Sequence, residues 1–305
     1  MEKKKIAVVG SLNMDMVTKV DHVPAAGETI LGEGISMVPG GKGANQAYAA
    51  GKLGGSVIML GAVGDDGPGG AMRENLHRVG VDTEQIAVMK GVPSGTAWIC
   101  VNRQGNNAIV VLAGANGCCD TDYIEAHREQ IEDCDYLLVQ LEIPLEAAAL
   151  AVRIAHEAGK TVILNPAPAR SDIPAQVFSM VDLVTPNETE LFLLTGKQAE
   201  NPALEEIEAQ AGEILKLGAK QVLVTLGDKG SMLARGDERT LFPAKKVKAV
   251  DTTAAGDCFN GALAVALAEG KNLEDAVRFA SAASAIAVQR PGAQTSIPER
   301  EEVEG

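Results

Sequence analysis

The chain has 305 residues, of which 46% are apolar and only 3% aromatic, so its core must be large, aliphatic and rich in alanine. Its 27 basic and 41 acidic residues give a formal net charge of −14, and a surface of that sign repels nucleic acid. No run of 18 apolar residues occurs, so no membrane-spanning helix and no membrane partner are expected. Any phosphate site must be made locally, from backbone N–H groups and helix ends.

Cysteine usage and the first residues bear on the cell compartment. The five cysteines are an odd number without CxxC spacing, and the four histidines lie far apart, so neither a disulfide framework nor a metal cluster is predicted. The lysines before the apolar stretch at 6–9 resemble a secretory signal, but polar Asn13 and Asp15 follow at once without a small-residue cleavage site. We therefore expect a first β-strand here and a reducing, cytoplasmic environment.

The chain alternates between predicted strands and helices. Short runs rich in β-branched and aliphatic residues predict buried parallel strands at 6–9, 57–60, 136–139, 161–164, 182–185 and 221–226. Helices are predicted over 145–158 and 204–215, which end near Gly159 and Gly218. This order predicts an α/β fold with a doubly wound, mostly parallel sheet and helices on both faces. Such sheets bind ligands at the carboxyl ends of their strands.

Two stretches, at about 15–40 and 95–113, break the alternation. Both are strand-like and punctuated by glycines, and the second contains a turn at 104–106. They predict a small β-sheet that covers the ligand edge as a lid or forms a dimer surface; an extra edge of the main sheet is the alternative. We predict one domain over 1–305 with this inserted lid, and a homodimer through the lid strands, because exposed strands invite pairing with another chain.

Polar and glycine-rich segments follow the first predicted strand. Asn13 and Asp15 lie just beyond it, at a place where ordinary loop residues are polar too. The segment 40–47, Gly-Gly-Lys-Gly-Ala-Asn-Gln-Ala, opens a helix but has neither Walker A spacing nor a Rossmann fingerprint. It is either a glycine turn before a helix, or a loop whose backbone approaches a polyhydroxyl ligand while Asn45 donates and accepts hydrogen bonds.

Three further segments end strands of the same predicted sheet. Glu142 adds a carboxylate after the strand at 136–139. Asn187 follows the strand at 182–185 and is either a helix N-cap or a contact to Mg2+-bound phosphate. The segment 225–230, Thr-Leu-Gly-Asp-Lys-Gly, is either a hairpin turn or a nucleotide-contacting loop. Each segment alone is ambiguous, yet all of them are compatible with one edge of the sheet.

The segment 251–261, DTTAAGDCFNG, carries the strongest chemical signal. Its tiny residues lead into an apolar helix over 262–268. Small residues let backbone N–H groups at a helix start approach an anion, and the helix dipole favours negative charge there. Asp257, in the first turn, is either a cap for those N–H groups or a base that accepts a proton from a sugar hydroxyl. In phosphoryl transfer such a base depends mainly on its position.

These motifs resemble, from end to end, the phosphofructokinase-B-type (PfkB) carbohydrate kinases. The resemblance rests on GSLNMD, PGGKGANQA, the GDD turn at 64–66, NETE, TLGDKGS, DTTAAGD and the closing RPGAQTSIP. DTTAAGD is typical of the whole family, whereas GGKGANQA with the C-terminal GAQ pattern resembles its ribokinase branch. The resemblance implies a ribokinase-like fold and, as cofactors, ATP, Mg2+ and a monovalent cation, usually K+.

The resemblance also implies roles for individual residues. The base would be Asp257, and the anion hole would be the N–H groups of Ala254, Ala255, Gly256 and Asp257. The sugar would be held by Asn13, Asp15, Gly41, Lys42, Gly43, Asn45 and Glu142. ATP would be bordered by Asn187, Thr225, Gly227, Asp228, Gly230, Gly256 and Ser281, with Glu190 reaching Mg2+ through water. The monovalent cation would lie among Asp251, Thr253, Ala287, Arg290, Gly292 and Ser296, several acting through backbone carbonyls.

Two positions depart from the family pattern. Cys258 stands where the family commonly has threonine after the aspartate; we expect it to pack in the helix without loss of activity. The pair Cys118-Cys119 is unusual for the loop near the lid, and nothing in the sequence explains it.

The predicted reaction is ATP-dependent phosphorylation of D-ribose at O5. Another small sugar, such as 2-deoxyribose or fructose, is an open alternative, because the sequence does not say which hydroxyls are bound. A nucleoside acceptor needs an apolar, usually aromatic slot, and the chain has only nine aromatic residues (one Trp, three Tyr, five Phe). A non-catalytic sugar- or nucleotide-binding module is disfavoured, because Asp257 and both glycine-rich loops are present.

Overall fold

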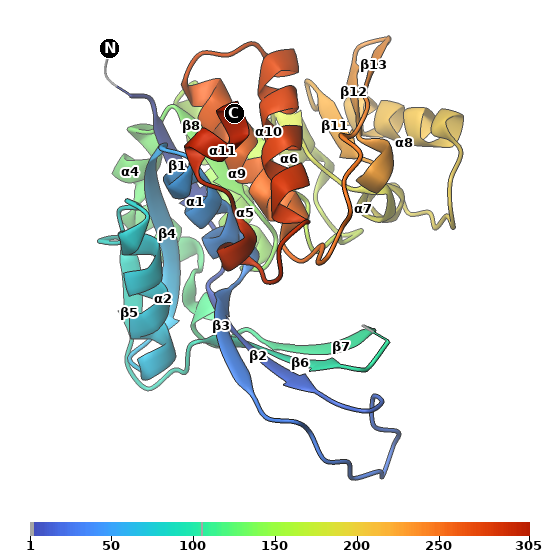
Figure 1. Cartoon of the computed structure of the whole chain (residues 1–305). Coiled ribbons are helices and arrows are strands. Elements are labelled where there is room, and N and C mark those ends of the chain that lie inside the picture. Colours follow the sequence, from blue (N-terminus) through green and yellow to red (C-terminus); the bar gives the residue numbers. More distant parts are fainter. Residues whose placement is uncertain (1–2, 105) are drawn as a thin grey trace.

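A computed structural model describes residues 3–104 and 106–305 (Figure 1). Gly105, in the predicted turn at 104–106, and the first two residues lie outside the described residues. The main sheet has nine strands in the order β13 (Glu238–Phe242), β12 (Ser231–Arg235), β11 (Val222–Thr225), β10 (Leu183–Val184), β9 (Thr161–Leu164), β8 (Tyr136–Val139), β1 (Lys5–Val9), β4 (Ser56–Gly64) and β5 (Ile86–Met89). The strands from β11 to β5 pair in parallel, and β12 pairs antiparallel with both of its neighbours.

Helices cover both faces of this sheet. One face packs against α1 (Lys42–Lys52), α2 (Gly67–Arg78), α9 (Ala255–Ala268), α10 (Leu273–Ala287) and α11 (Arg300–Glu304). The other packs against α3 (Thr121–Ala126), α4 (Arg128–Glu132), α5 (Leu145–Glu157), α6 (Ala175–Phe178), α7 (Glu188–Leu194) and α8 (Leu204–Lys216). Along β1, Ile6 and Val8 join the first core while Ala7 and Val9 join the second, as the period of a strand requires. The predicted doubly wound fold is confirmed.

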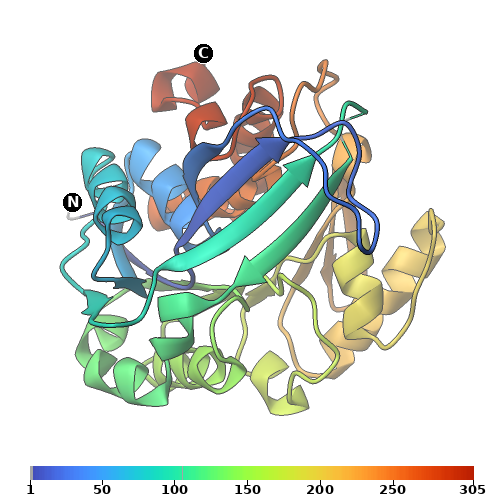
Figure 2. The same cartoon turned by 90° about the horizontal axis from the view of Figure 1, so that it is seen from below.

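A second, four-stranded sheet lies apart from the main one. Its order is β3 (Ser36–Gly40), β2 (Asn13–Lys19), β6 (Gly95–Val101) and β7 (Asn107–Leu112), and β2 pairs in parallel with β6. It projects from the carboxyl edge of the main sheet and, seen from below, lies across that edge (Figures 1 and 2). The two predicted insertions therefore pair with each other, and the alternative of an extra edge on the main sheet is wrong.

Local sequence signals located most elements but not all. The strands at 136–139 and 161–164 match β8 and β9, and α5 and α8 end before Gly159 and Gly218, whose φ angles are 71° and 109°. Glycine adopts this left-handed backbone readily, so a glycine just after the C-cap indicates where a helix ends. Strand β4 runs four residues further than predicted, to Gly64, and β10 keeps only two residues. Strands β5, β12 and β13 were not predicted as strands, since they are short edge elements with weak patterns.

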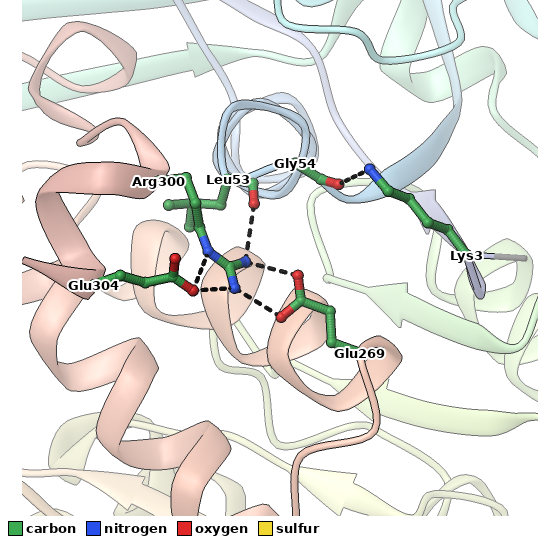
Figure 3. Close-up of polar contacts among 6 residues, drawn as sticks. All are labelled: Lys3, Leu53, Gly54, Glu269, Arg300 and Glu304. Atoms are coloured by element: carbon green, nitrogen blue, oxygen red, sulfur yellow. Dashed lines mark hydrogen bonds and ion pairs between the residues drawn. The ribbon is translucent and has the colours of Figure 1, made fainter. Parts of the chain in front are cut away.

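The C-terminal ends of α1 and α9 are tied together at the opposite edge of the sheet (Figure 3). The Arg300 guanidinium donates to the Leu53 carbonyl (3.2 Å) and pairs with the Glu269 carboxylate at 2.7 and 3.0 Å, and also with Glu304. Lys3 donates to the Gly54 carbonyl at 3.0 Å. Cations at helix C-termini are favoured by the helix dipole, so both chain ends stabilise this junction. Among the described residues, no helix is long and apolar enough to cross a membrane.

Candidate active site

The start of α9 presents backbone donors at the carboxyl edge of the sheet. Its N-cap, Ala254, has left-handed backbone (φ 57°), and no side chain caps the helix. That conformation costs a non-glycine residue ~1–2 kcal/mol and marks a place where the surroundings impose it. The N–H groups of Gly256 and Asp257 have no acceptor within the described residues. Uncapped N–H groups and the positive end of the dipole make this helix start suited to an anion.

Asp257 lies buried in the first turn of α9, facing the start of α1. One carboxylate oxygen accepts from the Asn45 amide and the other from the Gln46 amide, both at 2.9 Å. Burial raises the pKa of Asp257, while Lys42 and the two amides act in the opposite direction. Burial also works against the Lys42 ammonium, but the carboxylates of Asp257, Glu142 and Glu190 outweigh it and raise the pKa of Lys42.

A cavity of 310 Å³ lies between the second sheet and the end of β8. It is lined by side chains that include Asn13, Asn116 and Glu142 and by apolar residues from Val111 to Pro168. Ser11 and the backbone N–H of Lys42 donate to one Glu142 oxygen at 2.5 and 3.0 Å, and Asn116 donates to Asn13 at 2.8 Å. These bonds fix the polar groups at the mouth of the cavity.

Asp15 is the fourth carboxylate of the region. Its burial, followed by the charges of Glu142 and Asp257, raises its pKa to about 7. The four carboxylates, Asp15, Glu142, Glu190 and Asp257, thus come from four separate segments. Three of them, Glu142, Glu190 and Asp257, act on the Lys42 ammonium, and Asp15 lies near Glu142 and Asp257.

The glycines at the start of α1 are required by packing. Gly41 has a φ of 88°, and a Cβ there would lie 2.6 Å from the Asn13 nitrogen. A Cβ at Gly43 would lie 2.6 Å from the Gly10 backbone. The glycine-turn interpretation therefore accounts for both residues. Because these glycines let α1 begin directly against the end of β1, Asn45 lies beside Asp257.

The predicted nucleotide-side residues gather at the ends of β10 and β11. Asn187 caps α7 in a capping box, with 2.8 Å bonds in both directions between Asn187 and Glu190. Thr225 donates its N–H to the Pro186 carbonyl at 2.9 Å, and the 3-10 turn η2 (Gly227–Lys229) joins β11 to β12. The N-cap and hairpin interpretations are thus confirmed as local structure. Asn187, in the connection from β10 to α7, bridges to Thr225 at the end of β11, and the turn that follows β11 carries Gly227, Asp228 and Gly230.

Comparison with known proteins now decides the family. The model of the pfkB family of carbohydrate kinases matches residues 3–300. The chain belongs to that family. It is therefore a sugar kinase.

Three relatives illustrate the likeness to this kinase. A ribokinase of Schizosaccharomyces pombe is 44% identical and covers 98% of this chain and 96% of its own. The structure of Arabidopsis thaliana ribokinase complexed with ribose and ATP is 35% identical, covers 100% of this chain and 98% of its own, and has a TM-score of 0.92. A deoxyribokinase of Salmonella typhi is 35% identical, with coverage of 97% and 96%.

The predicted cation ligands of the kinase form a connected loop beside the start of α9. One Asp251 oxygen accepts from the Thr253 N–H (2.9 Å) and hydroxyl (2.6 Å), and the other accepts from the Gly292 N–H (2.8 Å). These bonds outweigh the effect of burial and lower the pKa of Asp251. Within the described part of the chain, no three His, Cys, Asp or Glu side chains are grouped as metal ligands.

The remaining predicted cation ligands lie in the segment that follows α10. The Ala287 carbonyl accepts from the Arg290 N–H (3.0 Å), and the Arg290 guanidinium pairs with the Glu302 carboxylate. Ser296 donates to the Ala293 carbonyl at 2.7 Å. The available groups are oxygens, the donors that hard cations prefer.

Some residues that lie at the site were not predicted. Ser281 lies half-buried on α10, whereas Ser284, one turn further, donates to the Ala255 carbonyl at 3.0 Å and so touches the start of α9. Gln46, whose amide also donates to Asp257, lies in the segment 40–47, but only its neighbour Asn45 was predicted as a site residue. Asn165 binds Gln46 from the end of β9. Asn165 could have been predicted in the same way as Asn13, because it is a polar residue directly after a buried strand.

The raised pKa of Asp15 predicts a pH-dependent cost to folding. The unfolded chain releases this proton near pH 3.8, whereas the folded protein holds it up to about pH 7, so this stabilising contribution is complete below pH 3.8 and lost as the pH rises to 7. Asp15→Asn cannot ionise. The free energy of unfolding of Asp15→Asn, minus that of the natural protein, should increase by ~1–3 kcal/mol between pH 5 and pH 8. Urea unfolding without sugar measures it, and exposed Asp237→Asn is the control. Parallel pH curves for Asp15→Asn and the natural protein would contradict the prediction.

Proposed function

We propose that this kinase transfers the γ-phosphoryl group of ATP to O5 of D-ribose. One observation carries the proposal: the buried Asp257 carboxylate lies in the first turn of a helix in which the N–H groups of Gly256 and Asp257 have no acceptor within the described residues, while the Ala255 N–H donates to the Thr252 carbonyl at 3.2 Å. O5 attacks the γ-phosphorus, the bond from that phosphorus to the bridging oxygen breaks, and ADP leaves. Asp257 takes the O5 proton, and the N–H groups of 254–257 stabilise charge on the transferring group.

Gly256 supports this placement of the phosphate. Its φ angle is not positive, and a Cβ built on it would meet nothing within 4 Å. Neither the backbone conformation nor the packing of the chain requires glycine here, although glycine weakens a helix. Close approach of a ligand to the helix start does require it, as expected for an anion hole.

The proposed acceptor site is the cavity beside Asn13 and Glu142. Lys42, Asp15 and Asn45 lie around the same edge, and Gly41 and Gly43 let α1 begin directly against it. None of the lining residues is aromatic, so a nucleoside base would find no stacking partner. Ribose is favoured because the S. pombe and A. thaliana relatives are ribokinases. The Salmonella typhi deoxyribokinase makes 2-deoxyribose the second candidate.

The proposed nucleotide and cation sites flank the helix start. ATP would lie along Asn187, Thr225, Gly227, Asp228 and Gly230. Glu190 uses one oxygen in the capping box, and its other oxygen fits a water-mediated contact with Mg2+. When bound, Mg2+ would neutralise charge on the phosphates. A monovalent cation in the loop of Asp251 and Thr253 would fix the segment that leads into α9.

We place this kinase in the cytoplasm. All five cysteines are unpaired, which fits a reducing compartment. Burial raises the pKa of Cys119, Cys134 and Cys258 to about 12, so these thiols stay protonated and inert. Cys258 packs fully buried in α9, as a small hydrophobe would. Nothing in the structure explains why two cysteines, Cys118 and Cys119, stand next to each other.

We also propose that two copies pair through the second sheet, which would act as a shared lid. Trp98, Val110 and Leu112 are 49%, 62% and 53% exposed there, and Met37 is exposed on β3. Such an apolar surface on an open sheet favours association with another chain. Sedimentation should therefore give a species of twice the 31.7 kDa chain mass; a monomer at micromolar concentration would contradict this.

The reaction is tested by ADP release with ATP, Mg2+ and K+, offering ribose, 2-deoxyribose, fructose and adenosine separately. The natural protein should prefer ribose. Asp257→Asn should lower kcat by at least ~10²-fold, because the base is lost, while ribose binding changes little. Isothermal titration with ribose checks the binding.

Each result of this assay has a definite meaning. Preference for another acceptor would keep the mechanism and change the substrate. Near-natural turnover by Asp257→Asn would contradict the role of the base. No turnover with any acceptor would favour a binding module.

The cation site makes a separate prediction. Replacing K+ by tetramethylammonium should lower kcat several-fold, because the loop before α9 loses a cation that fixes the anion hole. The KM for ribose should change little, since the loop does not line the sugar cavity. Steady-state rates at constant ionic strength measure this effect. Equal rates in both salts would remove the proposed cation site.

A further inference from the structure

A fully buried amide, Gln46, is engaged on every side. Its Nε2 donates to the Asp257 carboxylate at 2.9 Å and to the Asn165 side chain at 3.0 Å. Its Oε1 accepts from Gln140 Nε2 at 2.6 Å. Both hydrogens and the oxygen are therefore used, which sets the orientation of the amide. Turning it over would point its oxygen at a carboxylate oxygen.

The hydrogen bonds continue from Gln46 back to the start of α9. Asn165 donates to the Thr185 carbonyl at 2.9 Å, and the Thr185 hydroxyl donates to Asn260 at 2.6 Å. Asn260 then donates to the Gly256 carbonyl at 2.9 Å. That carbonyl belongs to the same peptide unit as the N–H of Asp257. The circuit thus begins at the Asp257 side chain and ends at the Asp257 peptide.

This circuit has two physical consequences. A hydrogen bond to the Gly256 carbonyl polarises the peptide and strengthens its N–H as a donor. At the other end, rotating the Asp257 carboxylate away from Gln46 would leave a buried amide hydrogen unpaired, at a cost of ~1–3 kcal/mol. The carboxylate is therefore held in one orientation, and the Gly256–Asp257 peptide beside it is polarised so that its N–H is a stronger donor.

We propose that Gln46 is a positioning residue for phosphoryl transfer, which orients the Asp257 carboxylate and couples it through Asn165, Thr185 and Asn260 to the Gly256–Asp257 peptide. This inference rests on the proposed function, because it assumes that Asp257 is the base. Gln46 itself is fully buried, so it acts through Asp257 rather than on a substrate.

The acid limb of the pH profile of kcat distinguishes a residue that positions Asp257 from one that only stabilises the fold. The charged groups that face Asp257 are Lys42 on α1, Glu142 after β8, Asp15 on β2 and Glu190 on α7. All four remain in a Gln46 variant. The Gln46 hydrogen bond lowers the pKa of Asp257, so its removal raises that pKa, and the base becomes ionised only at higher pH.

The test compares Gln46→Leu and Gln46→Glu with Gln210→Leu. Gln210 is also buried but lies on α8, away from the site, so its variant controls for the loss of a buried amide. Both Gln46 variants should lower kcat about 10-fold, leave KM for sugar and ATP within about 3-fold, and move the acid limb of kcat to higher pH. Gln210→Leu should change none of these. Thermal unfolding confirms that each variant is folded.

A double-mutant cycle separates this inference from the proposed function. If Gln46 acts through Asp257, adding Gln46→Leu to Asp257→Asn should change the residual rate less than about 2-fold. An equal fold-loss in both backgrounds, or an unmoved acid limb, would overturn the positioning role. Natural turnover by Gln46→Leu while Asp257→Asn is slow would overturn this inference alone. Natural turnover by Asp257→Asn would overturn both.

Discussion

The close approach of α1 to α9 is the constraint on which the site depends. A Cβ at Gly261 would lie 2.6 Å from the Gln46 carbonyl and 2.7 Å from Ala49, so these helices are as close as glycine permits. Only at this separation can the side chains of Asn45 and Gln46 both reach Asp257. The Arg300 junction ties the two helices at their other ends, which preserves the alignment along their length.

The electrostatics of the site follow from this packing. Three carboxylates act on one lysine, and Asp15 lies beside two of them, in a chain that already carries a net charge of −14. Attraction of anionic ATP therefore depends on local positive potential, from Lys42 and the uncapped start of α9, and not on the surface as a whole. Burial raises the pKa of the Asp257 carboxylate and so strengthens it as a base, whereas the two amides lower that pKa and help to keep the carboxylate ionised.

A site residue could be predicted from the sequence when its signal lay in the residues next to it. Asn13, Glu142 and Asn187 were found because polar residues directly follow buried strands, and Asp257 because tiny residues precede an apolar helix. Gln46 and Asn260 gave no such signal, since their partners are far along the chain and an amide within a helix is ordinary in sequence. The dual nature of Asn187, a helix cap placed at the ligand edge, also required the structure.

The sequence by itself determined the α/β class, the parallel strands of the core, the helix ends at Gly159 and Gly218, and the two insertions that form a second sheet. These features depend on periodicity and turn chemistry, which act over a few residues. Only the tertiary structure decided that the insertions pair in parallel through β2 and β6, and that a hydrogen-bonded circuit of three amides and one threonine from four segments closes on one peptide. Such pairings join residues up to 211 positions apart, and their geometry follows from packing that no local pattern records.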